Sequence, residues 1–233
     1  MTHTLTQFRL CPKSRAVRLL LSELGEPFEL RDERPWEYRR EFLALNPAGH
    51  LPVLQLSDGP VLIAVTAIVE YFNEVFGDPY AAARPGLITG EDALERAEVR
   101  RLIDWFDVKL NSEVTAPLMR EKVHKRFSGG SDTGPSPGVL RAVRANLSYT
   151  LGYMEYILSE RKWLGGSQLS YADLTAAAHV SCIDYMGEVP WDGHPVTRIW
   201  YARMKSRPSL RAVLADRVPG VAKPSRAYDD PDF

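Results

Sequence analysis

The chain has 233 residues, and its 29 Lys and Arg nearly balance its 30 Asp and Glu, giving a formal net charge of −1 at pH 7. This length suits one large domain or two small ones. The balanced charge argues against a nucleic acid or an anionic membrane as partner. No apolar run is long enough to span a bilayer, and the first residues lack a signal-peptide pattern. We therefore expect a cytoplasmic protein with no nucleic acid partner and no membrane insertion.

The sequence gives no sign of a metal centre or a disulfide framework. Cys11 and Cys182 are the only cysteines, and the five histidines are scattered without metal-ligand spacing. Such a sparing use of cysteine is typical of a reducing compartment. We therefore predict no bound metal and no disulfide.

The first thirty residues follow a strand–helix–strand pattern. Leu5–Leu10 is predicted to form a strand, Ser14 is a candidate cap for the helix that follows, and Gly25 is predicted to end that helix. The helix carries an apolar stripe at i, i+3, i+4 and i+7, made by Val17, Leu20, Leu21 and Leu24. Pro27–Leu30 is the second strand, and the crossover predicts that it runs parallel to the first.

Arg31–Phe42 is dense in charge and contains three aromatic residues, Trp36, Tyr38 and Phe42. It is predicted to form a loop and a short, irregular helix. Two interpretations of Trp36 remain open at this point. Its indole either covers the edge of the core or, beside several arginines, belongs to a contact surface, since such a composition is typical of interfaces.

Asn46–Phe72 has the clearest pattern in the chain. An apolar strand begins at Leu51, Ser57–Gly59 is a hairpin turn because Asp-Gly tolerates positive φ, and a second strand begins at Val61. Apolar residues then recur at helical spacing up to Phe72. Pro52 cannot donate to a sheet ladder, so it is either a cis proline at the start of the strand or a trans proline on an edge.

The second half of the chain reads as helical. Gly77–Gly90 is rich in Gly, Pro and Ala and is predicted to be a linker. Thr89 is a candidate cap, with Glu91 and Asp92 in the first turn of the next helix. That helix has an apolar ridge with a spacing of four residues: Leu102, Phe106, Leu110, Val114 and Leu118. Phe127–Gly138 is a flexible break by composition.

Two further features are predicted after the break. Leu140–Leu158 is a helix, and Ser170 with Asp173 forms a capping box at the start of a helix with a small, buried face. The last segment, Ala215–Phe233, contains Pro219, Gly220, Pro224 and Pro231 and is predicted not to be helical. It is either a disordered tail or, given its aromatic residues, a strap across the helical domain or a docking peptide.

These motifs together resemble the glutathione S-transferase (GST) family. Three motifs that show the resemblance lie within Asn46–Tyr71, namely N-P-x-G-x-x-P-V-L, D-G-x-x-L and A-I-x-x-Y. The others are the S-x-x-D box at Ser170 and the closing R-M-x-x-R-P-S at Arg203–Ser209. The resemblance implies a GST fold. Its parts are a thioredoxin-like domain in residues 1–77, a linker in 78–90, an all-helical domain in 91–214 and an extended tail in 215–233. It also implies a cis Pro52 and a homodimer.

The chain departs from the family where glutathione is held. Family members carry Glu-Ser at the helix start that binds the γ-glutamyl end of glutathione, and this chain has Ala64-Val65 there. Charged groups left without partners at such a site cost about 1–3 kcal/mol each. We therefore expect no cofactor and a non-catalytic protein.

A glutathione-dependent enzyme is the alternative. Cys11 precedes a helix N-terminus, where a thiolate is stabilised, and its place resembles that of the nucleophile in cysteine-type GSTs. In that case Cys11 is the nucleophile and the backbone of Pro52 and Val53 aligns glutathione. Otherwise Cys11 is an inert thiol. A maleylacetoacetate-isomerase-like or stringent-starvation-like relative is a weaker option.

The overall likeness, together with the lost Glu-Ser pair, is to the GST-like proteins of alphaproteobacteria that bind the division GTPase FtsZ. This resemblance implies that the partner is the FtsZ filament, organised or curved by a homodimer with two binding sites. The candidate partner contacts are Trp36, Arg39, Glu113, Arg141, Arg144, Asp229 and Asp230.

Overall fold

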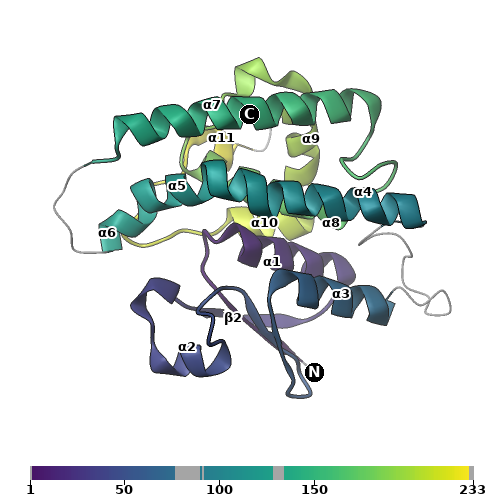
Figure 1. The fold of residues 1–233 in the computed structure, drawn as a ribbon, viewed down its shortest axis with the longest axis vertical. Helices are drawn as coiled ribbons and strands as arrows, with labels where there is room; N and C mark the ends of the chain where they lie inside the picture. Colours follow the sequence, from purple (N-terminus) through teal and green to yellow (C-terminus); the bar gives the residue numbers. More distant parts are fainter. Residues whose placement is uncertain (1, 77–89, 91, 128–133, 231–233) are drawn as a thin grey trace.

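The computed structural model describes residues 2–76, 90, 92–127 and 134–230. A small sheet with its helices forms the lower layer in Figure 1, and a stack of long helices forms the upper one. The predicted linker lies almost wholly outside the described residues, as do the candidate cap Thr89 and residues 128–133 of the predicted break.

The lower layer is built on a four-stranded sheet with the order β2-β1-β3-β4. The strands are β1 (His3–Gln7), β2 (Phe28–Asp32), β3 (Val53–Gln55) and β4 (Val61–Ile63). β1 pairs with β2 in parallel, as the crossover predicted, and with β3 antiparallel. β3 and β4 form the predicted hairpin, with Gly59 in its turn at φ 110. The Leu51–Pro52 peptide bond is cis.

Three α-helices and a 3₁₀ turn complete this domain: α1 (Pro12–Leu24), η1 (Pro35–Glu37), α2 (Arg40–Leu45) and α3 (Val65–Phe76). α1 ends at Gly25, which is left-handed at φ 77, as predicted. The prediction that Ser14 caps α1 is wrong. Pro12 occupies the first helical turn, for which its fixed φ is suited, so Cys11 is the cap residue and Ser14 is buried inside the helix.

The upper layer begins with one long helical rod. Its consecutive parts are α4 (Ala93–Asp104), η2 (Trp105–Thr115), α5 (Ala116–Met119), η3 (Arg120–His124) and α6 (Lys125–Phe127), of which η2 and η3 are π-helical. Asp92 is the cap of α4 rather than part of its first turn, because its carboxylate accepts from the N–H groups of Leu94 and Glu95.

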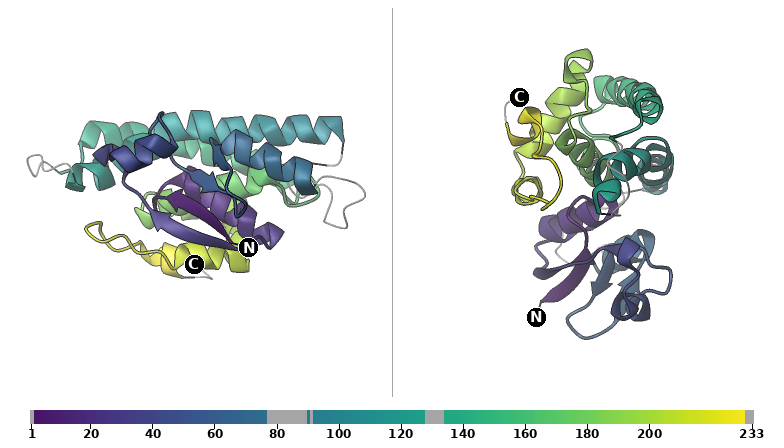
Figure 2. Two further views of the ribbon diagram at one scale, coloured as in Figure 1. Left: turned by 90° about the horizontal axis from the view of Figure 1, so that it is seen from below. Right: turned by 90° about the vertical axis from the view of Figure 1, so that its left-hand side faces the viewer.

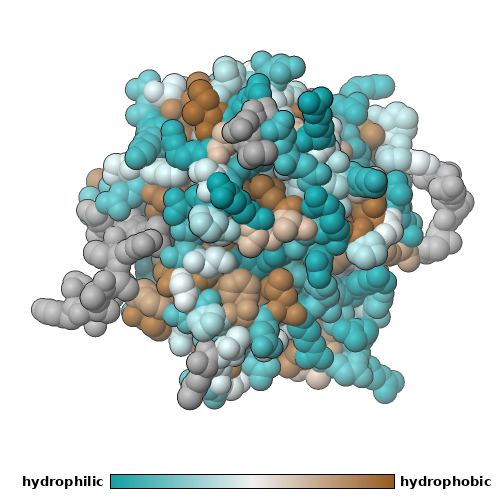
Figure 3. Space-filling model, turned by 180° about the vertical axis from the view of Figure 1, so that it is seen from behind, coloured by the Kyte–Doolittle hydropathy of each residue, from teal (hydrophilic) through white to brown (hydrophobic). Residues whose placement is uncertain are grey.

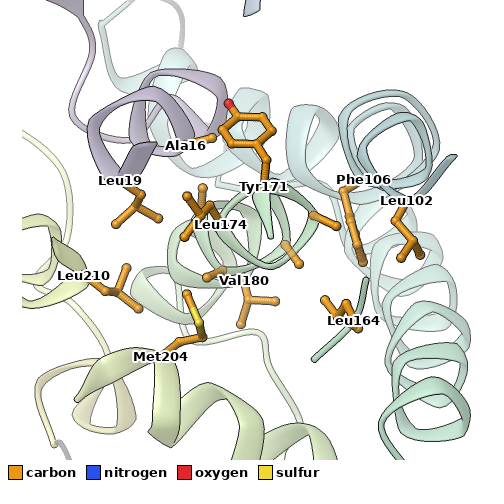
Figure 4. Packing of buried hydrophobic residues seen from close by; sticks show 14 of the residues in the cluster. Ala16, Leu19, Leu102, Phe106, Leu164, Tyr171, Leu174, Val180, Met204 and Leu210 are labelled. Carbon is orange, nitrogen blue, oxygen red and sulfur yellow. The ribbon is translucent and has the colours of Figure 1, made fainter. Parts of the chain in front are cut away.

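The remaining helices surround a buried one. They are α7 (Pro137–Glu160), α8 (Tyr171–Tyr185), η4 (Trp191–Gly193), α9 (Pro195–Lys205), α10 (Pro208–Leu214) and α11 (Arg226–Asp229). All fifteen residues of α8 are buried. Figure 4 shows Leu174 of α8 close to Ala16 and Leu19 of α1, and Figure 2 shows α1 directly below the helical layer, so the two layers share one core.

The predicted capping box at the start of α8 is present and does more than cap. Asp173 accepts from the backbone N–H and hydroxyl of Ser170, from the N–H of Leu164 and from Nε1 of Trp200. Burial raises the pKa of its carboxyl, and these hydrogen bonds act in the opposite direction. The box therefore joins α8 to α9 and to the turn before it.

Residues 215–225 of the tail are not helical, as predicted, but Arg226–Asp229 form the short helix α11, which the prediction missed. The short helix α11 fits between Pro224 and Pro231, and Ser225 caps it by accepting from the N–H of Tyr228. The ring of Tyr228 is buried, and the hydroxyl of this residue accepts a hydrogen bond from Arg15 at 3.1 Å. Lys205 donates to the carbonyl oxygens of Ala227 and Asp230. Residues 215–230 therefore form the strap that was one of the open interpretations.

The surface of the molecule is mixed in character. Figure 3 shows separate hydrophobic patches among hydrophilic residues on one face. Among the described residues, no helix is long and apolar enough to cross a membrane.

The Tyr228–Arg15 contact gives a first prediction. Tyr228→Phe keeps the ring but removes one hydrogen-bond acceptor of the buried Arg15 guanidinium. We expect the free energy of unfolding to fall by about 1.5–3 kcal/mol, measured by urea denaturation. The matched control is Asp229→Asn, which breaks an exposed ion pair with Arg217 and should change stability by less than about 1 kcal/mol. Equal losses in both variants would mean that the Arg15 contact is unimportant.

Candidate functional site

A cleft of about 900 Å³ lies between the sheet domain and the helical rod. Apolar and aromatic side chains make much of its wall, and polar groups from η2 face it from the helical side. The residues used below are Cys11, Trp36, Leu51, Ala64, Val65, Asp104, Asp107, Asn111 and Thr115. A concave, largely apolar pocket with a few converging polar groups is typical of a binding site.

Cys11 lies in this cleft as a half-buried thiol at the start of α1. Burial raises its pKa, and this outweighs the lowering by Ser14 and Lys13. Cys182 is fully buried, its thiol donates to the carbonyl oxygen of Leu10 at 3.2 Å, and burial raises its pKa to about 11. Desolvation therefore holds both cysteines as protonated thiols at neutral pH, and the helix N-terminus does not make Cys11 a thiolate.

The residues that replace the glutathione-binding pair lie on the same cleft. Val65 begins α3, and Ala64 has φ 72, a left-handed conformation that costs a residue with a side chain about 1–3 kcal/mol. Both present apolar side chains to the cleft. Pro52 and Val53, the candidate glutathione contacts, are buried, and it is Leu51 that lines the cleft.

Trp36 is half-buried and joins the two domains. Its ring lies edge-on to Phe8 at 5.0 Å, over His124 at 4.7 Å and stacked on Phe127 at 5.7 Å between centroids. The tail reaches the same cluster, because a side chain at Gly220 would come within 3.2 Å of Phe127. Trp36 thus covers the edge of the core and also lines the cleft, so the structure is compatible with both interpretations of this residue.

The other candidate contacts are bound into ion pairs or lie in solvent. Arg39 is paired with Glu33, Arg144 with Glu188 at 2.7 Å, and Glu113 accepts from Lys109 at 2.6 Å. Arg141 is exposed on α7. Asp229 pairs with Arg217 at 2.7 Å, and Asp230 offers its carbonyl oxygen to Lys205.

The structure does not bring these candidates into one surface. Trp36 and Arg39 lie just before α2, the helical-domain candidates lie on η2 and α7, and the two aspartates lie on and after α11, as the labels in Figure 1 show. Whether each of them contacts a partner stays a prediction.

The polar wall made by the end of α4 and by η2 was missed at the sequence level. Asp104, Asp107 and Asn111 line the cleft, and their spacing of i, i+3 and i+7 is the pattern of one helical face. Attention to the polar face opposite the apolar ridge would have found them. Within the described part of the chain, no group of three or more His, Cys, Asp or Glu is placed to hold a metal ion.

The arrangement defines a class of protein. A β2-β1-β3-β4 sheet with a cis proline before β3, packed on an all-helical domain across a cleft, is the GST fold that the sequence motifs implied. The family model for the glutathione S-transferase N-terminal domain matches residues 10–75, and that for the C-terminal domain matches residues 140–217. The chain belongs to the glutathione S-transferase family.

Its relatives include a protein named for its localization with FtsZ. FtsZ-localized protein A of Caulobacter vibrioides is 43% identical over 233 residues, which are 99% of this chain and 98% of that protein. The solved structure of FzlA from C. crescentus superposes with a TM-score of 0.92 at 43% identity and covers both chains fully. A glutathione S-transferase structure from Sinorhizobium meliloti 1021 gives a TM-score of 0.91, also at 43% identity and full coverage of both chains.

The protonated state of Cys11 is testable by alkylation. We expect iodoacetamide to modify Cys11 slowly at pH 7, with a rate that rises with a midpoint above the ordinary thiol pKa of about 8.5, since only the thiolate reacts. Mass spectrometry after timed quenching measures the rate. The Cys11→Ser variant is the control, because its remaining thiol is fully buried. A midpoint below pH 7.5 would show an activated nucleophile instead.

Proposed function

We propose that this protein is a non-catalytic member of the GST family that binds FtsZ and organises or curves its filaments in bacterial cell division, in the cytoplasm. The observation that carries the proposal is the 43% identity, over nearly the whole of both chains, to a protein named for its localization with FtsZ. The similarity extends over nearly the whole of both chains, so it is more than a shared fold.

The chemistry of the cleft supports binding rather than catalysis. A glutathione transferase must hold the charged ends of its cofactor and activate a thiol. Here Ala64 and Val65 offer apolar side chains at the cofactor position, and burial raises the pKa of the thiol of Cys11. A cleft of this size, with apolar side chains at the cofactor position and a thiol that is not activated, is suited to an apolar or aromatic group.

Trp36 is the side chain in this cleft best suited to anchor a partner. Tryptophan and arginine are the residue types that most often dominate binding energy at interfaces. Its ring already rests on Phe8, His124 and Phe127, so little side-chain freedom remains to be lost on binding.

A homodimer follows from the same proposal. Five large apolar side chains are exposed on α3, α4, η2 and α7, namely Val75, Leu94, Val108, Tyr149 and Tyr156. Beside them Trp105 stacks on Tyr149 and Tyr153. Exposed apolar surface of this kind marks interaction sites, and a symmetric dimer would cover it. Two copies of the cleft on one dimer could then bridge neighbouring filament subunits.

The alternative is a glutathione-dependent transferase that uses Cys11, favoured by the position of that thiol in the cleft at the start of α1. Calorimetric titration with glutathione separates the two functions. No heat of binding at millimolar glutathione removes the alternative, and binding that disappears in Cys11→Ala would make it the leading function.

The role of Trp36 is testable with purified FtsZ. We expect Trp36→Ala to weaken co-sedimentation with FtsZ polymers by tenfold or more, because truncation of an aromatic anchor costs about 2 kcal/mol or more. The control is Ile199→Ala, which removes an exposed side chain on α9 that does not line the cleft. Circular dichroism on both variants checks the fold. If Trp36→Ala unfolds, the residue serves the core, and if it binds normally, the cleft is not the site.

The dimer is testable by sedimentation equilibrium. We expect the wild-type chain to sediment with twice its mass of 26.2 kDa, and the double variant Tyr149→Glu, Tyr156→Glu to sediment as a monomer, because two charges would be buried without partners. Ile199→Glu is the control for an added surface charge. A double variant that keeps the mass of a dimer would place the interface elsewhere.

A further inference from the structure

η2 is an unusual part of the wall of the cleft. It is π-helical over eleven residues, Trp105–Thr115, within a rod that is otherwise α-helical except at η3. π-helices are rare, occur mostly as single turns and are frequent at functional sites. η2 supplies Asp107, Asn111 and Thr115 to the cleft. A long π-helical segment at this place needs a physical cause.

One cause lies in the apolar ridge of the rod. Its five residues are spaced by four, and all are at most 1% exposed: Leu102, Phe106, Leu110, Val114 and Leu118. In an α-helix four residues turn about 40° past a full circle, so the ridge would drift by about 160° over its length. A π-helix has more than four residues per turn, so the ridge drifts in the opposite sense there, and the α-helical and π-helical parts together keep it on the core.

A second cause is a hydrogen-bonded clasp from the neighbouring helix. His179 is fully buried in α8. Its Nδ1 lies 2.9 Å from Oγ1 of Thr115, and its Nε2 lies 3.1 Å from Oδ1 of Asp107. One imidazole therefore bonds two side chains of η2 that are eight residues apart in the sequence. In an α-helix residues with that separation are about 12 Å apart along the axis.

The clasp is well placed to fix the geometry of η2. A π-helix contains more residues per turn than an α-helix and is correspondingly shorter, which brings Asp107 and Thr115 towards opposite sides of one ring. α8 carries the ring and is itself held by its capping box and by burial of every residue. The apolar ridge favours a wide turn all along the rod, whereas the clasp acts only on η2.

We propose that His179 is a positioning residue that holds η2 in its π-helical form and so determines which side chains of η2 face the cleft. Without the clasp, η2 relaxes towards 3.6 residues per turn, and Asn111 rotates away from the wall that Asp104 and Asp107 share. The inference deepens the proposed function and rests on it only for the claim that the cleft binds the partner.

The experiment compares three variants by amide hydrogen exchange and mass spectrometry. His179→Phe fills the space of the ring without its hydrogen bonds. Thr115→Val removes one end of the clasp with little change of volume. Ser181→Ala is the matched control, because Ser181 is a buried polar residue of the same helix that accepts from Arg15. We expect exchange in residues 105–115 to rise at least tenfold more in the first two variants than in the control.

Three results would overturn the inference. One is exchange that rises equally over the whole chain in His179→Phe and Thr115→Val, which would show a general loss of stability. Another is unchanged exchange in η2. The third is a crystal structure of Thr115→Val, or of His179→Phe, in which η2 is still π-helical with Asn111 in the cleft. Co-sedimentation with FtsZ polymers is measured separately, so failure of the wild type to bind would overturn the proposed function and leave the exchange result to decide the role of His179.

Discussion

The packing of α8 against α1 is the constraint on which the rest of the structure depends. α1 belongs to the sheet domain and α8 to the helical domain, and a single apolar core runs through both. Polar side chains on a fully buried helix are costly unless they are hydrogen-bonded inside the protein. This explains why Asp173 receives hydrogen bonds from three residues and why His179 is bonded at both ring nitrogens. The cleft lies between the two domains that this packing holds together.

The same joint contains several buried charges, and each of them is paired. Arg15 donates to Ser181, to the carbonyl oxygen of Arg9 and to Tyr228, while Arg18 is paired with Asp216 at 2.5 Å. Breaking a buried pair costs about 3–5 kcal/mol, because one charge is then left uncompensated. Burying the charges carries a desolvation penalty that offsets most of their attraction, so these contacts add little net stability compared with apolar residues of the same size. What they do is specify one relative placement of α1, α8 and the tail.

Much of the fold could be predicted from the sequence because it follows from local patterns. Alternation, turn residues and apolar spacing gave the strands, the Gly59 hairpin, the long helices and the capping box at Ser170, and the family motifs gave the GST fold. The failures depend on contacts distant in sequence. Nothing near Tyr228 indicates that Arg15 will bond it, so the tail looked helix-free. The π-helical form of η2 is equally hidden, since its clasp comes from His179, 64 and 72 residues away.

The candidate site was predicted less well, for a related physical reason. The loss of the Glu-Ser pair is visible in two adjacent residues, and the structure places both on the cleft. Partner contacts carry no such local signature. Arg39, Arg144 and Glu113 look like free surface charges in the sequence, yet each is bound to a neighbouring charge. Only the fold shows which charged side chains are already engaged.

The contact between Arg15 and Tyr228 has a consequence for how the protein is made. The two residues are 213 positions apart, so on the ribosome α1 emerges long before the tyrosine that its arginine needs. Until then the guanidinium of Arg15 cannot be buried without a large penalty, although domains begin to fold from the N-terminus during synthesis. This contact between the two halves can therefore form only after Tyr228 has left the ribosome, and a chain that terminates before α11 lacks the hydroxyl to which Arg15 donates.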